Sequence, residues 1–279
     1  MSNRSLANRR LTLPGGTDLA YRDNGRGTGE SSGHELTLVL LHGFCGSSAY
    51  WEGLLPLLEP RYRIITADLR GHGNSSGAGD RVLQMEQLAD DIAELISAIE
   101  GDNIVLLGHS MGGYAALALA EKYPDLLSGL GLIHSTPMPD SPEAQEGREK
   151  AAAALANNGI VPFVNGLVPK LFAPSNLESD LVARAKEIGY GTAAADAAAA
   201  ALGMKQRPDR SSVLESLQIP LLLVAGSEDA VIPPAKVFAA QGSRTRTEVL
   251  EGAGHMSMME QPEKLASLLE EWLKTELNV

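Results

Sequence analysis

The sequence predicts an α/β fold, in which a mostly parallel central sheet is flanked by helices and carries an inserted helical segment. Short runs that are apolar at nearly every position, such as Thr37–Leu41 and Leu221–Ala225, are typical of strands buried on both faces of a parallel sheet. These runs alternate with helix-forming stretches, which indicates connections that cross over the sheet. Between residues 137 and 208 the strand pattern stops, and this interruption indicates the insertion.

The first elements are expected to form a hairpin. Two short strand patterns, Arg10–Leu13 and Leu19–Arg22, are joined by the turn-forming sequence Pro14-Gly15-Gly16. Residues 24–35 are rich in glycine and serine, so we expect an exposed loop there. The first buried strand, Thr37–Leu41, follows this loop.

The β/α alternation continues through the first half of the chain. Its helices are recognised by apolar residues three or four positions apart, as at Leu88, Ile92 and Leu95. In chain order, the expected elements are a helix over Ser48–Leu58, a strand over Tyr62–Ala67, a helix over Leu83–Ile99, a strand over Ile104–Leu107, a helix over Tyr114–Lys122 and a strand over Leu127–His134.

The insertion is expected to be helical. Alanine-rich stretches at residues 151–156 and 193–201, and a proline-interrupted apolar stretch at 160–172, carry no convincing strand pattern. We therefore expect a core of residues 1–136 and 209–279 and a helical lid over 137–208. Within the second part of the core, the expected elements are a strand over Leu221–Ala225, a helix over Ala235–Ala240, a strand over Thr247–Leu250 and a helix over Pro262–Leu277.

Composition limits the classes of function. The formal net charge of −12, from 35 acidic and 23 basic residues, argues against nucleic acid as a partner. The single cysteine, Cys45, excludes an intramolecular disulfide and favours a reducing, cytoplasmic compartment. No apolar run approaches the roughly 18 residues of a membrane span, and the first ten residues do not resemble a signal peptide. The oligomeric state stays open between a monomer and a weak dimer.

The sequence Gly108-His109-Ser110-Met111-Gly112 lies between a strand pattern and a helix pattern. A sharp strand-to-helix turn at a serine is the nucleophile elbow. The serine backbone must be strained to expose its Oγ, and Gly108 and Gly112 leave room where a Cβ would clash. Free N–H groups at the start of the helix then face the place where an oxyanion would form. A glycine-rich turn without chemistry is the alternative interpretation.

A serine nucleophile needs a base and an acid that orients the base. In folds with this elbow, the acid follows the serine and the histidine comes last. Of the six histidines only His255 lies near the C-terminus, whereas His134 comes too early to leave room for an acid. The acid is predicted to be Asp229, which follows a strong strand pattern, with Glu228 and Asp140 as alternatives. A histidine in a surface loop, without chemistry, is the alternative for His255.

The oxyanion needs two convergent N–H groups. We expect one from Met111, directly after the serine, and one from Phe44, after the strand that ends at residue 41. His42 is expected to brace this loop through backbone hydrogen bonds, and Cys45 to be a small buried residue. No His, Cys, Asp or Glu cluster has the sequence spacing of a metal site, and there is no phosphate-binding loop. No metal and no cofactor are therefore predicted.

Taken together, these motifs resemble the α/β-hydrolase superfamily, in the family's order and over residues about 37–260. Similar sequences include carboxylesterases, lactonases, cofactor-free haloperoxidases and C–C bond hydrolases. The dehalogenase and epoxide-hydrolase branches are disfavoured, because they use an aspartate where this chain has Ser110. The resemblance also implies a lid above the site. The motifs that carry it are His42-Gly43-Phe44, Asp68-x-Arg70-Gly71-x-Gly73-x-Ser75, Gly108-x-Ser110-x-Gly112, Gly226-x-x-Asp229 and Gly254-His255.

The predicted function is hydrolysis of a small carboxylic ester through an acyl-enzyme, with Ser110, His255 and Asp229 as the triad. The alternatives are a C–C bond hydrolase or lactonase on the same triad, and a small-molecule receptor with little turnover. A covered apolar pocket should favour acyl chains of about four to eight carbons, because each methylene that fits contributes up to about 0.8 kcal/mol. The residues expected to contact the substrate are His109, Phe163, Leu167, Phe172 and Met256.

Overall fold

The structure is a computed structural model that describes residues 4–25, 36–79, 82–99, 101 and 103–277. The predicted exposed loop, residues 24–35, lies outside the described residues from residue 26 onward. Within the described part, no helix is both long enough and apolar enough to cross a membrane.

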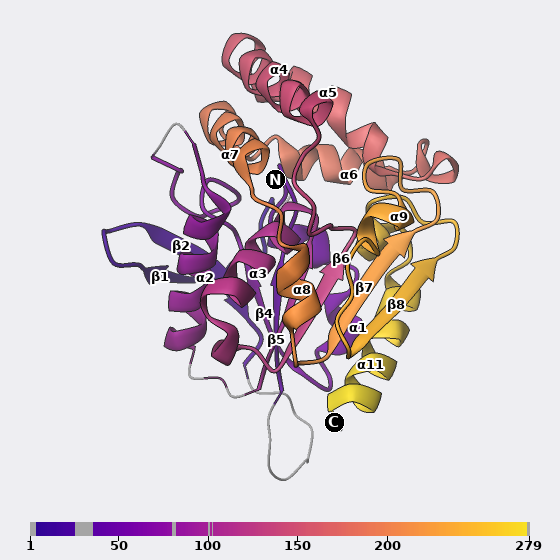
Figure 1. Cartoon of the computed structure of the whole chain (residues 1–279). Helices are drawn as coiled ribbons and strands as arrows, with labels where there is room; N and C mark the ends of the chain where they lie inside the picture. The colour runs from indigo at the N-terminus through magenta and orange to yellow at the C-terminus, as the bar shows by residue number, and fades with distance from the viewer. Residues whose placement is uncertain (1–3, 26–35, 80–81, 100, 102, 278–279) are drawn as a thin grey trace.

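The described strands form one sheet in the order β1-β2-β4-β3-β5-β6-β7-β8 (Figure 1). The pairs β1–β2 and β2–β4 are antiparallel, and every later pair is parallel. The predicted mostly parallel sheet is therefore confirmed. The strands are β1 (Arg9–Thr12), β2 (Asp18–Asp23), β3 (Thr37–Leu41), β4 (Arg63–Ala67), β5 (Ile104–His109), β6 (Gly129–Ile133), β7 (Leu221–Gly226) and β8 (Thr245–Leu250).

The central strands are buried along their whole length, because helices cover both faces of the sheet. Every residue of β3, β5, β6 and β7 is buried. One apolar cluster joins one face to α2 (Met85–Ala98), α3 (Met111–Lys122) and α8 (Ser211–Ser216). A second cluster joins the other face to α1 (Leu55–Leu58) and α11 (Pro262–Leu277).

Some predicted boundaries differ from the structure. The predicted helix Ser48–Leu58 is split into a 3₁₀ turn, Ser48–Trp51, and the single-turn α1. Conversely, α3 begins at Met111 rather than Tyr114. The carbonyl of Ser110 accepts hydrogen bonds from the N–H groups of Gly113 and Tyr114, so Gly112 and Gly113 belong to the first turn of the helix. The helix predicted over Ala235–Ala240 is only the short α9 (Pro234–Val237), and β8 begins two residues earlier than predicted.

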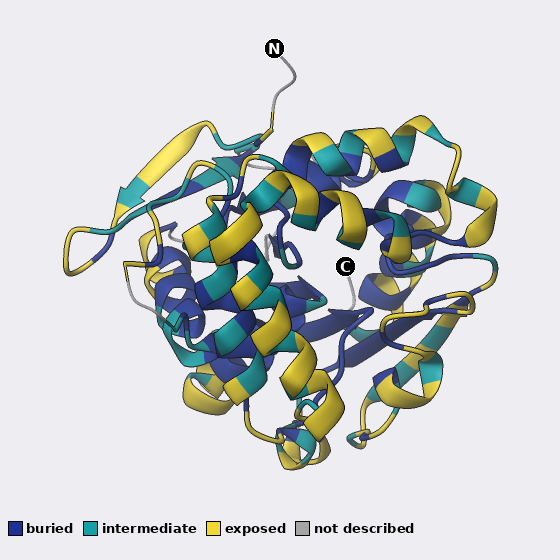
Figure 2. Ribbon diagram, turned by 90° about the horizontal axis from the view of Figure 1, so that it is seen from above, coloured by how far each residue is buried: buried dark blue, intermediate teal, exposed yellow. Residues whose placement is uncertain are grey.

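Between β6 and α8, the chain forms helices that lie at the carboxyl ends of the parallel strands (Figure 1). We call α4 to α7 the inserted helices. Seen from above, their outer sides are largely exposed, while the strands below are buried (Figure 2). The inserted helices are α4 (Pro142–Asn158), α5 (Ile160–Leu167), α6 (Asp180–Gly189) and α7 (Ala194–Gln206), with 3₁₀ turns at Val168–Leu171 and Pro174–Asn176.

The helix α7 is attached closely to the core. The N–H of Leu83 donates to the carbonyl of Ala199 at 3.0 Å. A Cβ at Gly203 would lie 1.7 Å from the carbonyl oxygen of Leu83, so only glycine allows this approach. The inserted helices therefore have a fixed anchor on the chain just before α2.

Candidate active site

Ser110 lies at the sharp turn between β5 and α3, with φ +50° and ψ −113°. Such a conformation is strained for a residue with a side chain and persists only where the surroundings enforce it. Here the N–H of Ser110 donates to the carbonyl of Ile133 at 3.0 Å, and Ser135 Oγ donates to the carbonyl of Ser110 at 2.8 Å. A Cβ at Gly112 would lie 2.5 Å from the carbonyl oxygen of Leu41, so this position needs a glycine.

His255 and Asp229 are in contact although 26 positions separate them in the chain, and His255 lines the same cavity as Ser110. The imidazole Nδ1 of His255 lies 2.7 Å from Asp229 Oδ2. The other oxygen, Oδ1, accepts the N–H groups of Val231 and Ile232 at 2.8 and 2.9 Å. Glu228, the neighbouring candidate, is exposed. The structure therefore brings His255 to Asp229 and not to Glu228.

Asp229 is held as a carboxylate by the groups around it. Burial alone would raise its pKa, but the adjacent charge of His255 and hydrogen bonds from His134 and His255 outweigh burial. The net effect is a pKa well below the usual range of an aspartic acid. A carboxylate at this position accepts a hydrogen bond from His255 Nδ1 and so fixes the orientation of the imidazole ring.

His134 is a further member of this cluster, and chain order gave no sign of it. Its Nδ1 lies 3.2 Å from Asp229 Oδ2, the oxygen that His255 also contacts, and its Nε2 lies 2.8 Å from Ser257 Oγ. The side chain is fully buried, and burial lowers its pKa more than the bond to Asp229 raises it. His134 is therefore neutral, and the two imidazoles share one carboxylate oxygen.

Within the described residues, His134, Asp229 and His255 have donor atoms within 4.8 Å of one another, a spacing that would suit a metal ion. The sequence spacing could not show this group, because it joins residues from three separate loops. Both Nδ1 atoms, however, point at the carboxylate and are engaged in hydrogen bonds with it. The geometry is that of a hydrogen-bonded cluster around Asp229 rather than an open set of ligands.

His109, which precedes the serine, supports the histidine loop. Its Nε2 donates to the carbonyl of His255 at 2.9 Å. Burial is the largest cause that keeps the pKa of His109 well below its usual value. A neutral imidazole therefore holds the backbone of the residue that carries the second imidazole.

The two predicted oxyanion donors flank the serine. Phe44 follows β3, and Met111 is the first residue of α3. Neither N–H donates to a backbone oxygen in the described part of the chain. His42 braces the loop as expected, because its Nδ1 donates to the carbonyl of Gly43 at 2.8 Å and its Nε2 accepts the N–H of Leu69 at 3.0 Å. Both donors are thus available to a bound oxygen.

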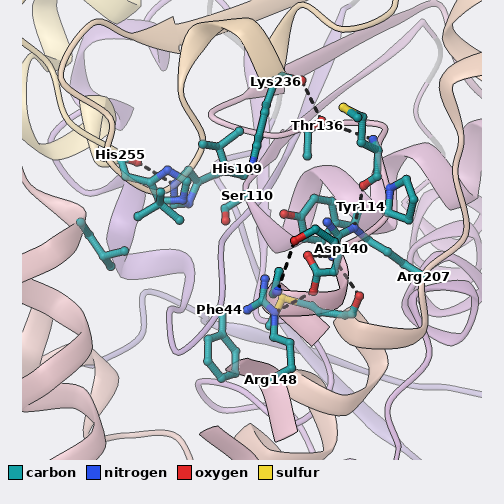
Figure 3. Close-up of a pocket in the computed structure, with 18 of the residues that line it drawn as sticks. Phe44, His109, Ser110, Tyr114, Thr136, Asp140, Arg148, Arg207, Lys236 and His255 are labelled. Carbon is teal, nitrogen blue, oxygen red and sulfur yellow. Dashed lines mark hydrogen bonds and ion pairs between the residues drawn. The ribbon is translucent and has the colours of Figure 1, made fainter. Parts of the chain in front are cut away.

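A cavity of about 420 Å³ opens above Ser110 (Figure 3). His109 and Leu167, two of the residues predicted to contact the substrate, line this cavity. The lining also includes side chains that were not predicted to contact the substrate, which come from α3, the segment before α4, α7 and the residue after it, and α9: Tyr114, Thr136, Met138, Asp140, Met204, Arg207 and Lys236.

Three of the expected substrate contacts lie outside this lining. Phe172 and Met256 are buried, with exposed fractions of 5% and 0%. Phe172 lies behind the histidine loop, since a Cβ at Gly254 would be 2.7 Å from its carbonyl carbon. Phe163 instead packs edge-to-face on Phe44 at 5.9 Å and faces a neighbouring hollow.

Asp140, the alternative acid, has a different role in one wall of the cavity. It forms ion pairs with Arg207 at 2.7 Å and with Arg148 at 3.1 Å. Arg207 also lies over the ring of Tyr114, with 4.0 Å between the guanidinium carbon and the ring centroid. Asp140 is thus neutralised by two arginines and does not contact His255 (Figure 3).

Comparison with known proteins agrees with this geometry. A family model described as the alpha/beta hydrolase fold matches residues 37–262. The structure of a thermophilic esterase from Thermogutta terrifontis, with malate bound, is similar with a TM-score of 0.87 and 35% sequence identity. That similarity covers 95% of this chain and 97% of the esterase.

Two curated proteins are also similar in sequence. A pimeloyl-[acyl-carrier protein] methyl ester esterase from Aeromonas hydrophila is 29% identical over 252 residues, which cover 88% of this chain and 98% of that protein. The dihydrolipoyllysine-residue acetyltransferase component of the acetoin cleaving system of Pseudomonas putida is 35% identical over 231 residues. That match covers 82% of this chain but only 60% of the Pseudomonas protein.

Proposed function

Because this chain belongs to the alpha/beta hydrolase fold family, we propose that it is a serine hydrolase that cleaves a carboxylic ester through an acyl-enzyme. The observation that carries the proposal is the pairing of His255 with Asp229 at 2.7 Å beside a serine on a strained turn. A nucleophile, a base and an orienting acid in this order are the parts that acyl transfer requires. The resemblance to two esterases, one of which cleaves a methyl ester, supports an ester as the substrate.

In the proposed reaction, Ser110 Oγ attacks the acyl carbon while His255 Nε2 takes the hydroxyl proton. Asp229 keeps the tautomer in which Nδ1 carries a proton, and it stabilises the imidazolium that forms. The N–H groups of Phe44 and Met111 donate to the oxyanion of the tetrahedral intermediate. When the intermediate collapses, the imidazolium gives its proton to the leaving alcohol.

Deacylation repeats these steps with water. His255 takes one proton from a water molecule, and the resulting hydroxide attacks the acyl carbon of the ester that Ser110 now forms. The proton returns to Ser110 as the acid leaves, so one water is consumed for each ester cleaved. We further propose that the inserted helices act as a lid, because they lie over the carboxyl ends of the strands where Ser110 is exposed.

The proposal is tested by labelling and turnover on the same sample. A fluorophosphonate should modify Ser110, which peptide mass spectrometry would locate. Protein that has not been labelled should hydrolyse p-nitrophenyl butyrate over many cycles, and the activity of the sample should fall in proportion to the fraction of Ser110 that is labelled. Labelling at Ser110 with about one product molecule per protein would instead indicate a receptor. Hydrolysis of a panel of lactones without hydrolysis of open-chain esters would instead indicate a lactonase.

A further inference from the structure

A second hollow lies beside the cavity that holds Ser110. It is a groove of about 570 Å³ between α4 and α5, and we call it the α4–α5 groove. Its lining is mainly apolar or small. The cavity and the groove adjoin each other, because five residues line both: Phe44, Ala144, Arg148, Leu167 and Val231.

The junction lies next to the reacting atoms. Phe44, whose N–H is a proposed oxyanion donor, lines both hollows and packs edge-to-face on Phe163 at 5.9 Å. Leu167, at the end of α5, also lines both hollows. A chain attached to the substrate carbonyl or to its leaving oxygen therefore has an apolar exit from Ser110 towards the groove.

Two glycines in the helices that border the groove, Gly147 and Gly166, widen it because they have no side chains, and packing does not require a glycine at either position. Gly147 lies within α4 and Gly166 within α5, where glycine costs about 1 kcal/mol relative to alanine. A Cβ on either glycine would meet no atom within 4 Å, so neither residue is needed for a close approach. Both line the groove, and side chains at these two positions would project into it.

Two cations also line the groove and limit what it can hold. Arg148 at the junction has its charge compensated by Asp140 at 3.1 Å. Lys170 is exposed, so its ammonium remains in water while its stem lies against the groove. Apart from these cations and the amide of Asn158, the lining consists of alanine, glycine, proline, phenylalanine, leucine and valine, which offer few partners to a polar occupant.

We propose that the α4–α5 groove binds a linear alkyl chain of the substrate, in its acid or its alcohol part, while the ester group lies at Ser110. This inference rests on the proposed ester hydrolysis and extends it to a substrate class. It differs from the expectation that a closed pocket stops the gain at about eight carbons, because a longer chain that passes the shared residues would enter the groove. Each further methylene that leaves water should raise kcat/KM by up to about fourfold.

The test measures chain-length profiles of purified protein below the micellar range of each ester. One series varies the acid, with p-nitrophenyl esters from acetate to dodecanoate. The other varies the alcohol, with acetates from methyl to decyl. The series that continues to gain beyond eight carbons identifies the part of the substrate that enters the groove. If neither series gains beyond eight carbons, the inference is overturned.

Matched substitutions then locate the effect. Gly147→Leu and Gly166→Leu each add a side chain to the groove from opposite walls, and thermal unfolding would check that both variants fold. Ala156→Leu is the control, because Ala156 is exposed on α4 and lines neither hollow. We expect the ratio of kcat/KM for the decanoate to that for the butyrate to fall at least tenfold in both glycine variants and to be unchanged in the control. Equal ratios in all three variants would refute the groove.

A binding measurement separates failure of the groove from failure of the proposed reaction. In a Ser110→Ala background, calorimetry would compare 1-decanol with 1-butanol as ligands. Tighter binding of decanol that Gly147→Leu abolishes would support the groove even if no ester were turned over. Binding that Gly147→Leu leaves unchanged would refute it, even if butyrate were hydrolysed well.

Discussion

Glycines at the reaction centre and glycines in the inserted helices face opposite surroundings. A Cβ at Gly226, at the end of β7, would lie 2.3 Å from the carbonyl oxygen of Gly254 and 2.4 Å from that of Ala253. Because Gly226 has no side chain, the loop that carries His255 can lie directly against the loop that carries Asp229. At Gly147, in contrast, a Cβ would meet nothing within 4 Å. Backbone contact fixes the chemistry, whereas absent side chains leave space for the substrate.

The strongest test of this contrast is at the reaction centre. Ser110→Ala should lower kcat for p-nitrophenyl butyrate by about a millionfold, because the nucleophile is lost while the fold is retained. Stopped assays with circular dichroism as a folding check would measure it. Retention of more than about one hundredth of the activity would show that another group attacks.

The next effect concerns the acid that His255 contacts. Asp229→Asn should reduce kcat by about 10⁴-fold, because the imidazole is left in the wrong tautomer. Glu228→Gln is the matched control, and its exposed side chain should matter little. A larger loss in the glutamate variant than in the aspartate variant would reassign the acid.

Substitution of His134, which contacts the same carboxylate of Asp229, should lower kcat by less than substitution of Asp229 itself. His134→Phe keeps the ring size but removes both hydrogen bonds, so kcat should fall by about ten- to a hundredfold. His134→Asn can still donate from its amide near the position of Nδ1 and should recover much of the activity. If both variants lost activity equally, the role of His134 would be packing and not the orientation of Asp229.

The smallest effects compare the two kinds of glycine directly. Gly226→Ala should lower the free energy of unfolding by about 1–3 kcal/mol, because backbone atoms must separate to admit the Cβ. Gly147→Ala should raise it by up to about 1 kcal/mol through helix propensity. Urea unfolding would measure both. If both substitutions changed the free energy of unfolding in the same direction, the proposed contrast between the glycines of the reaction centre and those of the inserted helices would be wrong.

Sequence reasoning succeeded where a feature is local. The turn at Ser110 is specified by five adjacent residues, and the parallel sheet by short apolar runs. It missed His134 because the contact with Asp229 joins residues 95 positions apart. The α4–α5 groove was also hidden, since only the packing of the inserted helices decides that Gly147 of α4 and Gly166 of α5 line the same hollow. Phe172 was expected to contact the substrate, but it follows a 3₁₀ turn that directs it into the core.

The buried histidines have a consequence for proton uptake during unfolding. His42, His72, His109 and His134 are each almost fully buried, and burial lowers the pKa of all four; for His72, burial and the charge of His42 lower it to about 3. In the unfolded chain each would titrate near pH 6.5, so the unfolded state binds more protons below that pH. Stability should therefore decline as the solution is acidified below about pH 6.5. Acid inactivation of this protein would then be a loss of the fold as well as a change in its reacting groups.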